Sequence, residues 1–169
     1  MSIVVLKQAD IFYEFTNTQL ELVSSITEER TYEPNEIIFE ENTPGSELSV
    51  IADGEVAIQV NPALLGKKDA NLQAQTIATL RRGQSFGEIS LVDEGLRSAR
   101  VKATDDGTRL VVIPRDRLMR LCDSYPQLGY RLMRNLAADL AMKIRNTDLQ
   151  VREYLTWTHQ DDDSSSAGD

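Results

Sequence analysis

The stretch between Phe86 and Val101 brings together side chains that could bind a phosphorylated sugar. Gly87 lacks a Cβ, so the main chain there could turn tightly and approach a ligand closely. Arg97 offers a permanently charged, planar group that can donate to two phosphate oxygens at once. Glu88 would repel a phosphate, but its carboxylate suits a hydroxyl of an attached ribose. These residue types at this spacing predict a site for a sugar that carries an anionic group.

Main-chain groups and small side chains around Arg97 would complete such a site. A short helix beginning at Gly87 would present free N–H groups and the positive end of its dipole to an anion. Ser98 adds a hydroxyl, and Ala99 adds a main-chain N–H beside it. The predicted ligand-binding residues of this stretch are Phe86, Gly87, Glu88, Ile89, Ser90, Arg97, Ser98, Ala99 and Val101.

Length and composition exclude several other classes of protein. A chain of 169 residues is long enough for one domain with a sizeable core. Cys122 is the only cysteine and His159 the only histidine, so we expect neither a disulfide framework nor a metal. No apolar run approaches the roughly 18 residues of a membrane span, and the apolar start is too short for a signal peptide. We therefore expect a cytoplasmic protein with no membrane partner.

The net charge of −9 is unevenly distributed along the chain. Residues 1–60 hold 12 acidic and 2 basic side chains, whereas residues 61–115 hold 6 acidic and 9 basic ones. The basic part contains Arg97, which suits an anionic ligand. Nucleic-acid binding depends on clustered Lys and Arg, and the chain as a whole is acidic. We therefore expect no DNA partner.

Short runs with period-two alternation predict a β-rich central region. Asp53-Gly54, between two strong strands, is typical of a β-hairpin, and residues 61–75 resemble a polar inserted loop. Closing such strands into a roll leaves few free edges. We therefore expect a mainly β fold, an antiparallel β-roll of the double-stranded β-helix or jelly-roll type with helices at both ends. The predicted strands are 37–39, 48–51, 56–60, 76–80, 99–103 and 110–113.

Helical spacing predicts helices on both sides of the strands. Residues 6–13 and 18–26 form the N-terminal pair, with Thr16 or Asn17 as a cap for the second helix. Pro114 suits the start of a helix to about residue 124, and Pro126 the start of a long one to about 157.

The long helix carries two apolar stripes. The first recurs every four residues and is expected to pack on the roll; its members are Leu128, Leu132 and Leu136. The second alternates spacings of four and three, as in a coiled coil, and consists of Met133, Ala137, Leu140, Ile144, Thr147, Val151 and Tyr154. We call this second stripe the seam. It predicts a parallel homodimer, and the alternative is a helix that folds back and buries the seam in its own chain.

Residues 86–101 resemble the phosphate-binding cassette of the cyclic nucleotide-binding domains, a pattern of roughly F-G-E-[LI]-A-L, a loop and P-R-[STA]-A-x-V. Upstream, the pattern from Tyr32 to Val56, with Gly45 and Gly54, resembles the opening strands and turns of the family. The resemblance covers roughly residues 28–155. It implies a non-enzymatic β-roll that binds a cyclic mononucleotide, with Arg97 on the phosphate and Glu88 on the ribose 2′-hydroxyl.

The resemblance is less informative about the base. In bacterial receptor proteins of the family a Thr-Ser pair of the long helix contacts adenine, and the matching positions here are Lys143 and Ile144. Ile144 could cover the base by apolar contact, without polar discrimination. Ser98 accompanies cyclic AMP in the bacterial receptors, which favours cyclic AMP over cyclic GMP. Asn42 stands where many members have Gly, and Asn also tolerates a left-handed turn.

Two other function classes remain as alternatives. The first is an interaction module on the same roll whose pocket is empty, with Glu88 and Arg97 as an internal ion pair. The second is an enzyme, which the sequence disfavours because it shows no nucleophile–base pair and no metal-ligand cluster.

The expected organisation has four parts. Residues 1–27 form N-terminal helices, 28–115 the cyclic nucleotide-binding roll, 116–157 the C-terminal helices, and 158–169 a disordered acidic tail. No segment after the long helix could form a winged helix-turn-helix. We therefore expect a stand-alone sensor whose ligand moves the long helix and whose output is a partner protein. The alternative is an effector domain outside this sequence.

Overall fold

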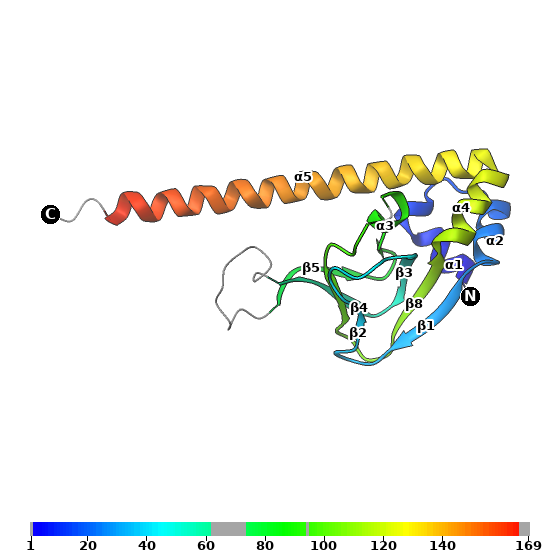
Figure 1. The fold of residues 1–169 in the computed structure, drawn as a ribbon, viewed down its shortest axis with the longest axis horizontal. Helices are drawn as coiled ribbons and strands as arrows, with labels where there is room; N and C mark the ends of the chain where they lie inside the picture. Colours follow the sequence, from blue (N-terminus) through cyan, green and yellow to red (C-terminus); the bar gives the residue numbers. More distant parts are fainter. Residues whose placement is uncertain (1, 62–73, 94, 166–169) are drawn as a thin grey trace.

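The computed structural model describes residues 2–61, 74–93 and 95–165. Two four-stranded antiparallel sheets face one another as a roll, and helices gather at one end of it (Figure 1). The strand orders are β1-β8-β3-β6 in one sheet and β2-β7-β4-β5 in the other. The predicted fold class is confirmed. The strands are β1 Glu28–Tyr32, β2 Ile37–Phe39, β3 Glu47–Asp53, β4 Glu55–Val60, β5 Gln75–Arg81, β6 Ser85–Phe86, β7 Arg100–Ala103 and β8 Thr108–Pro114.

Strands β3 and β8 are buried on both faces, which explains their continuous apolar runs. On β8, Leu110 and Val112 belong to the core between the two sheets. Val111 and Ile113 point the other way, into the core under the helices. One strand therefore joins the two cores, and a shift of one residue in its register would exchange both sets.

Two strands lie outside the predicted set. β1 has the sequence Glu-Glu-Arg-Thr-Tyr, and its side chains are exposed or half-buried. It lies at the edge of its sheet and pairs with β8, so charged residues on it are solvated. β6 has only two residues, Ser85 and Phe86, both buried, and it pairs with β3. Neither strand has the short apolar run by which the other strands are predicted.

The predicted hairpin at Asp53-Gly54 is wrong. β3 pairs with β8 and β6, whereas β4 pairs with β5 and β7 in the opposite sheet. Gly54 has a φ of +80°, and a Cβ there would lie 2.7 Å from Thr108 Oγ1. The Asp-Gly turn therefore carries the chain from one sheet to the other, because tertiary pairing overrides the local hairpin preference.

The N-terminal helices are α1 Ser2–Gln8, a short 3₁₀ helix η1 Asp10–Phe12 and α2 Asn17–Ser24. The first therefore begins before the predicted 6–13 and ends earlier, whereas α2 agrees with the prediction. Thr16 caps α2 in a capping box with Gln19. Short helix α3 spans Ile89–Val92, and α4 spans Arg115–Ser124 as predicted.

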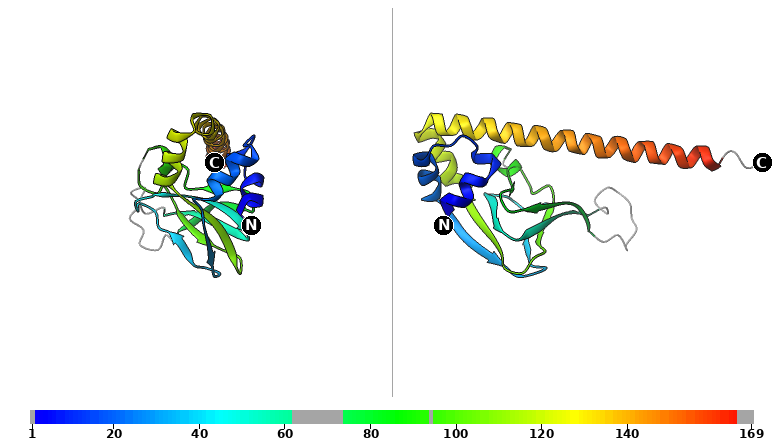
Figure 2. Two further views of the ribbon diagram at one scale, coloured as in Figure 1. Left: turned by 90° about the vertical axis from the view of Figure 1, so that its right-hand side faces the viewer. Right: turned by 180° about the vertical axis from the view of Figure 1, so that it is seen from behind.

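The long helix α5 spans Pro126–Ser165 and runs along the helical end and past the roll (Figures 1 and 2). Leu128, Leu132 and Leu136 are buried against the N-terminal helices, α4 and the roll, as predicted. The helix continues beyond the expected end near 157, because no Pro or Gly interrupts the sequence between Gly129 and Gly168. Residues 166–169 of the expected tail, and 62–73 of the expected loop, lie outside the described residues.

The seam of α5 is mostly exposed in this chain. Met133, Ile144 and Val151 are all solvent-exposed, whereas Leu140 packs partly on the core. The side chain of Tyr154 lies outside the described part of the structure. The helix therefore does not fold back to bury the seam in its own chain.

Candidate functional site

Arg97 is buried beside the segment that joins β2 to β3, with 6% of its surface exposed. Its main chain is bonded to residues 42 and 43: the N–H of Asn42 donates to the Arg97 carbonyl, and the Arg97 N–H donates to the Thr43 carbonyl. Asn42 has a φ of +61°, which agrees with the left-handed turn expected there. These bonds fix the backbone from which the guanidinium projects.

The guanidinium of Arg97 is held from three sides. Its Nη1 donates to the main-chain oxygen of Glu47 at 3.1 Å and approaches Ser90 Oγ at 3.5 Å. Its central carbon lies 4.1 Å from the centre of the Phe39 ring, a cation–π contact. Phe39 in turn packs on Phe86, with ring centres 5.8 Å apart. Phe86, one of the predicted residues, therefore packs against the ring that contacts Arg97.

Two glycines make room for this guanidinium. A Cβ on Gly45 would lie 2.6 Å from Arg97 Nε, and a Cβ on Gly87 would lie 2.6 Å from Nη1. Gly87 also has a φ of +85°, which L side chains rarely adopt. Both glycines are therefore required by the position of Arg97, whereas the sequence analysis expects Gly87 to allow a tight turn and close approach to a ligand.

Arg97 is a buried cation with spare donor capacity. Burial lowers its pKa, and the negative charges of Glu47 and Glu88 partly offset this effect. Arg97 Nε is buried without a hydrogen-bond partner. A buried donor without a partner is costly, so Nε can still donate to an acceptor that reaches it.

Glu88 lies directly before α3, with 5% of its surface exposed. Lys143 of α5 places its Nζ 2.7 Å from Glu88 Oε1. The second oxygen, Oε2, is buried and has no hydrogen-bond partner. An ionised carboxylate accepts on both oxygens, so Oε2 is an unused acceptor. Glu88 and Arg97 thus offer an acceptor and a donor that lack partners.

Lys143 lies beside Glu88 and not where the family resemblance places it. The resemblance puts it at a base-contact position, whereas its ammonium reaches Glu88 and also lies 2.8 Å from Asp139. Burial alone lowers the pKa of Lys143, but the charges of Glu88 and Asp139 outweigh burial and raise it above its ordinary value. Its seven-residue spacing from Leu136 places both on one face of α5, which is the signal that could have identified it.

The remaining predicted residues divide by burial. Ser90 is buried beside Arg97, and Ala99 is also buried. Val101 belongs to the core between the sheets. Three others face solvent in this chain: Ser98, Ile89 and Ile144, the last with 62% of its surface exposed.

The alternative ion pair between Glu88 and Arg97 does not form. Within residues 2–61, 74–93 and 95–165, the ion pair of Glu88 is with Lys143. The side-chain hydrogen bonds of Arg97 go to Glu47 and Ser90. In the same part of the chain, no group of three or more His, Cys, Asp or Glu side chains is arranged to hold a metal ion. None of the described helices combines the length and hydrophobicity of a membrane crossing.

Several known proteins are similar to this chain in sequence or in structure. The Cyclic AMP receptor protein of Thermus thermophilus is 32% identical over 146 residues, which cover 86% of this chain and 62% of that protein. Human cGMP-dependent protein kinase 2 is 24% identical over 123 residues, covering 73% of this chain and 15% of the kinase. A cyclic nucleotide-binding domain from Methylobacillus flagellatus has a TM-score of 0.74 at 25% identity, covering 90% of this chain and 82% of that one.

The chain spans less than two thirds of these two sequence relatives. More than a third of the Thermus thermophilus protein therefore has no counterpart in this sequence. The expectation that DNA is not a partner is consequently unsupported, because an acidic roll says nothing about segments beyond it.

The match to a family description is the most direct of the comparisons. The description "Cyclic nucleotide-binding domain" matches residues 29–125. This span runs from β1 through α4 and contains both Glu88 and Arg97. The resemblance inferred from residues 86–101 is confirmed, and the chain belongs to the cyclic nucleotide-binding domain family.

Proposed function

We propose that this protein is a cytoplasmic, non-catalytic sensor that binds a cyclic mononucleotide, cyclic AMP in preference to cyclic GMP. The observation that carries the proposal is the pair of buried, unpartnered atoms Arg97 Nε and Glu88 Oε2. An anionic phosphate oxygen supplies the acceptor that Arg97 lacks, and a ribose hydroxyl supplies the donor that Glu88 lacks. A cyclic nucleotide carries both groups close together on one small molecule.

Calorimetric titration with cyclic AMP and cyclic GMP tests this proposal. We expect both to bind and cyclic AMP to bind more tightly by less than about tenfold, or ~1.4 kcal/mol, because Ile144 would cover the base by apolar contact without polar discrimination. Adenosine 5′-monophosphate is the control, since it retains the base and ribose but not the cyclic phosphate. A strong preference for cyclic GMP would favour the ligand named for the kinase relative. Absence of binding by either would favour an interaction module.

Glu88 is proposed to accept the ribose 2′-hydroxyl. We expect 2′-deoxy cyclic AMP to bind about 1–3 kcal/mol more weakly than cyclic AMP, because it leaves a buried charged acceptor unpaired. Glu88→Gln should shrink this difference, since the amide is a weaker, neutral acceptor. Competition binding measures both. Equal affinities for the two nucleotides in the wild type would contradict the role of Glu88.

The output is proposed to pass through α5 in a parallel homodimer, with a partner protein reading the moved helix. Exposure of Met133, Ile144 and Val151 supports pairing through the seam. We expect Val151→Asp to yield a monomer, because it places a charge inside the seam. Gln150→Asp adds the same charge outside the seam and should leave the dimer intact. Light scattering measures the mass; a monomeric wild type would contradict the dimer.

A further inference from the structure

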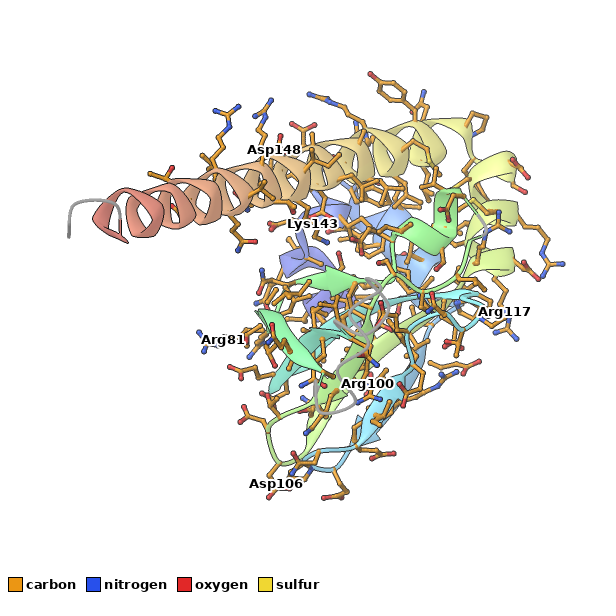
Figure 3. The ribbon with its side chains drawn as sticks, turned by 60° about the vertical axis from the view of Figure 1, so that its left-hand side comes forward. Arg81, Arg100, Asp106, Arg117, Lys143 and Asp148 are labelled. Atoms are coloured by element: carbon orange, nitrogen blue, oxygen red, sulfur yellow. The ribbon has the colours of Figure 1, made fainter. Side chains whose placement is uncertain are left out.

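Helix α5 places the ammonium group of Lys143 at the proposed ribose site. Lys143 Nζ lies 2.7 Å from Glu88 Oε1 and 3.5 Å from the main-chain oxygen of Ser85. Figure 3 shows Lys143 on the side of α5 that faces the roll, whereas Asp148 lies on the opposite side of the helix. The contact joins residues 55 positions apart in sequence, so only the docking of α5 on the roll brings them together.

Lys143 is also where the packed part of α5 ends. The buried stripe Leu128, Leu132 and Leu136 precedes it, and Lys143 continues that face two turns beyond Leu136. Every described side chain from 144 to 153 is exposed. In the described part of the chain, the ion pair with Glu88 is therefore the last inward contact of the helix before it projects into solvent.

Asp139 gives Lys143 a second carboxylate partner on its own helix. Its carboxylate lies one helical turn before Lys143 and 2.8 Å from the same ammonium. If α5 moved away from Glu88, Lys143 would keep a counter-ion on its own helix. In the described residues the ion pair of Glu88 is with Lys143, and Arg97 acts on its charge only at longer range. Loss of Lys143 would therefore remove the cation in direct contact with the carboxylate.

We propose that Lys143 is a positioning residue for Glu88. Its ammonium donates to Oε1 and so fixes the orientation of the carboxylate, with Oε2 left for the ribose hydroxyl. The inference rests on the proposed function and adds its regulation: docking of α5 improves hydroxyl recognition, and a bound ribose in turn favours docked α5. Such linkage is reciprocal by thermodynamic necessity. The ligand needs no direct contact with α5, because Glu88 touches both.

The test compares cyclic AMP with 2′-deoxy cyclic AMP in four proteins. These are the wild type, Lys143→Met, Lys143→Arg and the control Arg145→Met, which removes a cation from an exposed position of α5. The quantity measured is the ratio of the two dissociation constants. Both nucleotides carry the same phosphate, so the ratio cancels the general loss of one positive charge near the ligand.

We expect Lys143→Met to reduce the ribose preference by about tenfold, the loss of a well-aimed charge-assisted hydrogen bond. Lys143→Arg should retain part of the preference, and Arg145→Met should match the wild type. Hydrogen exchange over residues 140–153 should slow on adding cyclic AMP to the wild type but not to Lys143→Met. Lys143→Ala replaces the Met variant if the latter does not fold.

The possible outcomes distinguish the positioning role of Lys143 from the proposed nucleotide binding. If Lys143→Met binds with an unchanged ratio, Glu88 is aimed without Lys143, and the positioning role is overturned while the sensor function stands. An increased ratio would also overturn it, because Lys143 would then compete with the hydroxyl. If the wild type binds neither nucleotide, the proposed function itself fails, and the role of Lys143 with it.

Discussion

Replacing Arg97 with alanine should weaken cyclic nucleotide binding about a hundredfold or more. The guanidinium is the buried cation of the proposed phosphate site, and charge-assisted hydrogen bonds contribute roughly 1.5–3 kcal/mol each. Arg97→Lys should give an intermediate loss, because a single ammonium keeps the charge but cannot donate like the planar fork or stack as well on Phe39. Calorimetry with cyclic AMP measures the three affinities.

Arg81 provides the matched control for loss of a cation. Its side chain is 74% exposed and pairs with Glu55 on the neighbouring strand, so Arg81→Ala should leave the affinity unchanged. Arg97 packs on Phe39 and bonds Glu47, so the thermal unfolding midpoint of each variant must be measured alongside. A folded Arg97→Ala protein with near wild-type affinity would refute the phosphate assignment.

Gly87→Ala should lower both ligand affinity and stability. The φ of +85° makes alanine strained there by about 1–2 kcal/mol. Its Cβ would also lie 2.6 Å from Arg97 Nη1 and 2.7 Å from the main-chain oxygen of Glu47, so the guanidinium must move. We expect binding at least about tenfold weaker, since charge-assisted bonds depend on the donor's position. Calorimetry and urea unfolding measure the two effects.

Gly107→Ala is the control that distinguishes backbone strain from displacement of the Arg97 guanidinium. Gly107 has a φ of +68°, but a Cβ there would meet nothing within 4 Å. This variant should therefore lose similar stability through its backbone and bind the nucleotide normally. Equal loss of affinity in both variants would mean that lowered stability, and not displacement of Arg97, explains the Gly87 result.

Local chemistry in the sequence was sufficient for the class of fold and for a hypothesis about three of the site residues. Short apolar runs, alternating in some strands and continuous in β3 and β8, predicted six of the strands. Gly87, Glu88 and Arg97 lie close together in sequence, so their types and spacing alone suggested an anion and a sugar. The left-handed turn expected at Asn42 is likewise present, because left-handed backbone has strong local residue preferences.

Tertiary structure decided what depends on distant partners. Asp53-Gly54 has the local chemistry of a hairpin, but β3 and β4 pair in different sheets, and pairing is settled by burial of both faces of β3. The ion pair of Glu88 could not be assigned from spacing either, because several cations were available and Arg97 was nearer in sequence. Docking of α5 through its leucine stripe places Lys143 at Glu88 and leaves Ile144 in solvent, since neighbouring helical residues point about 100° apart.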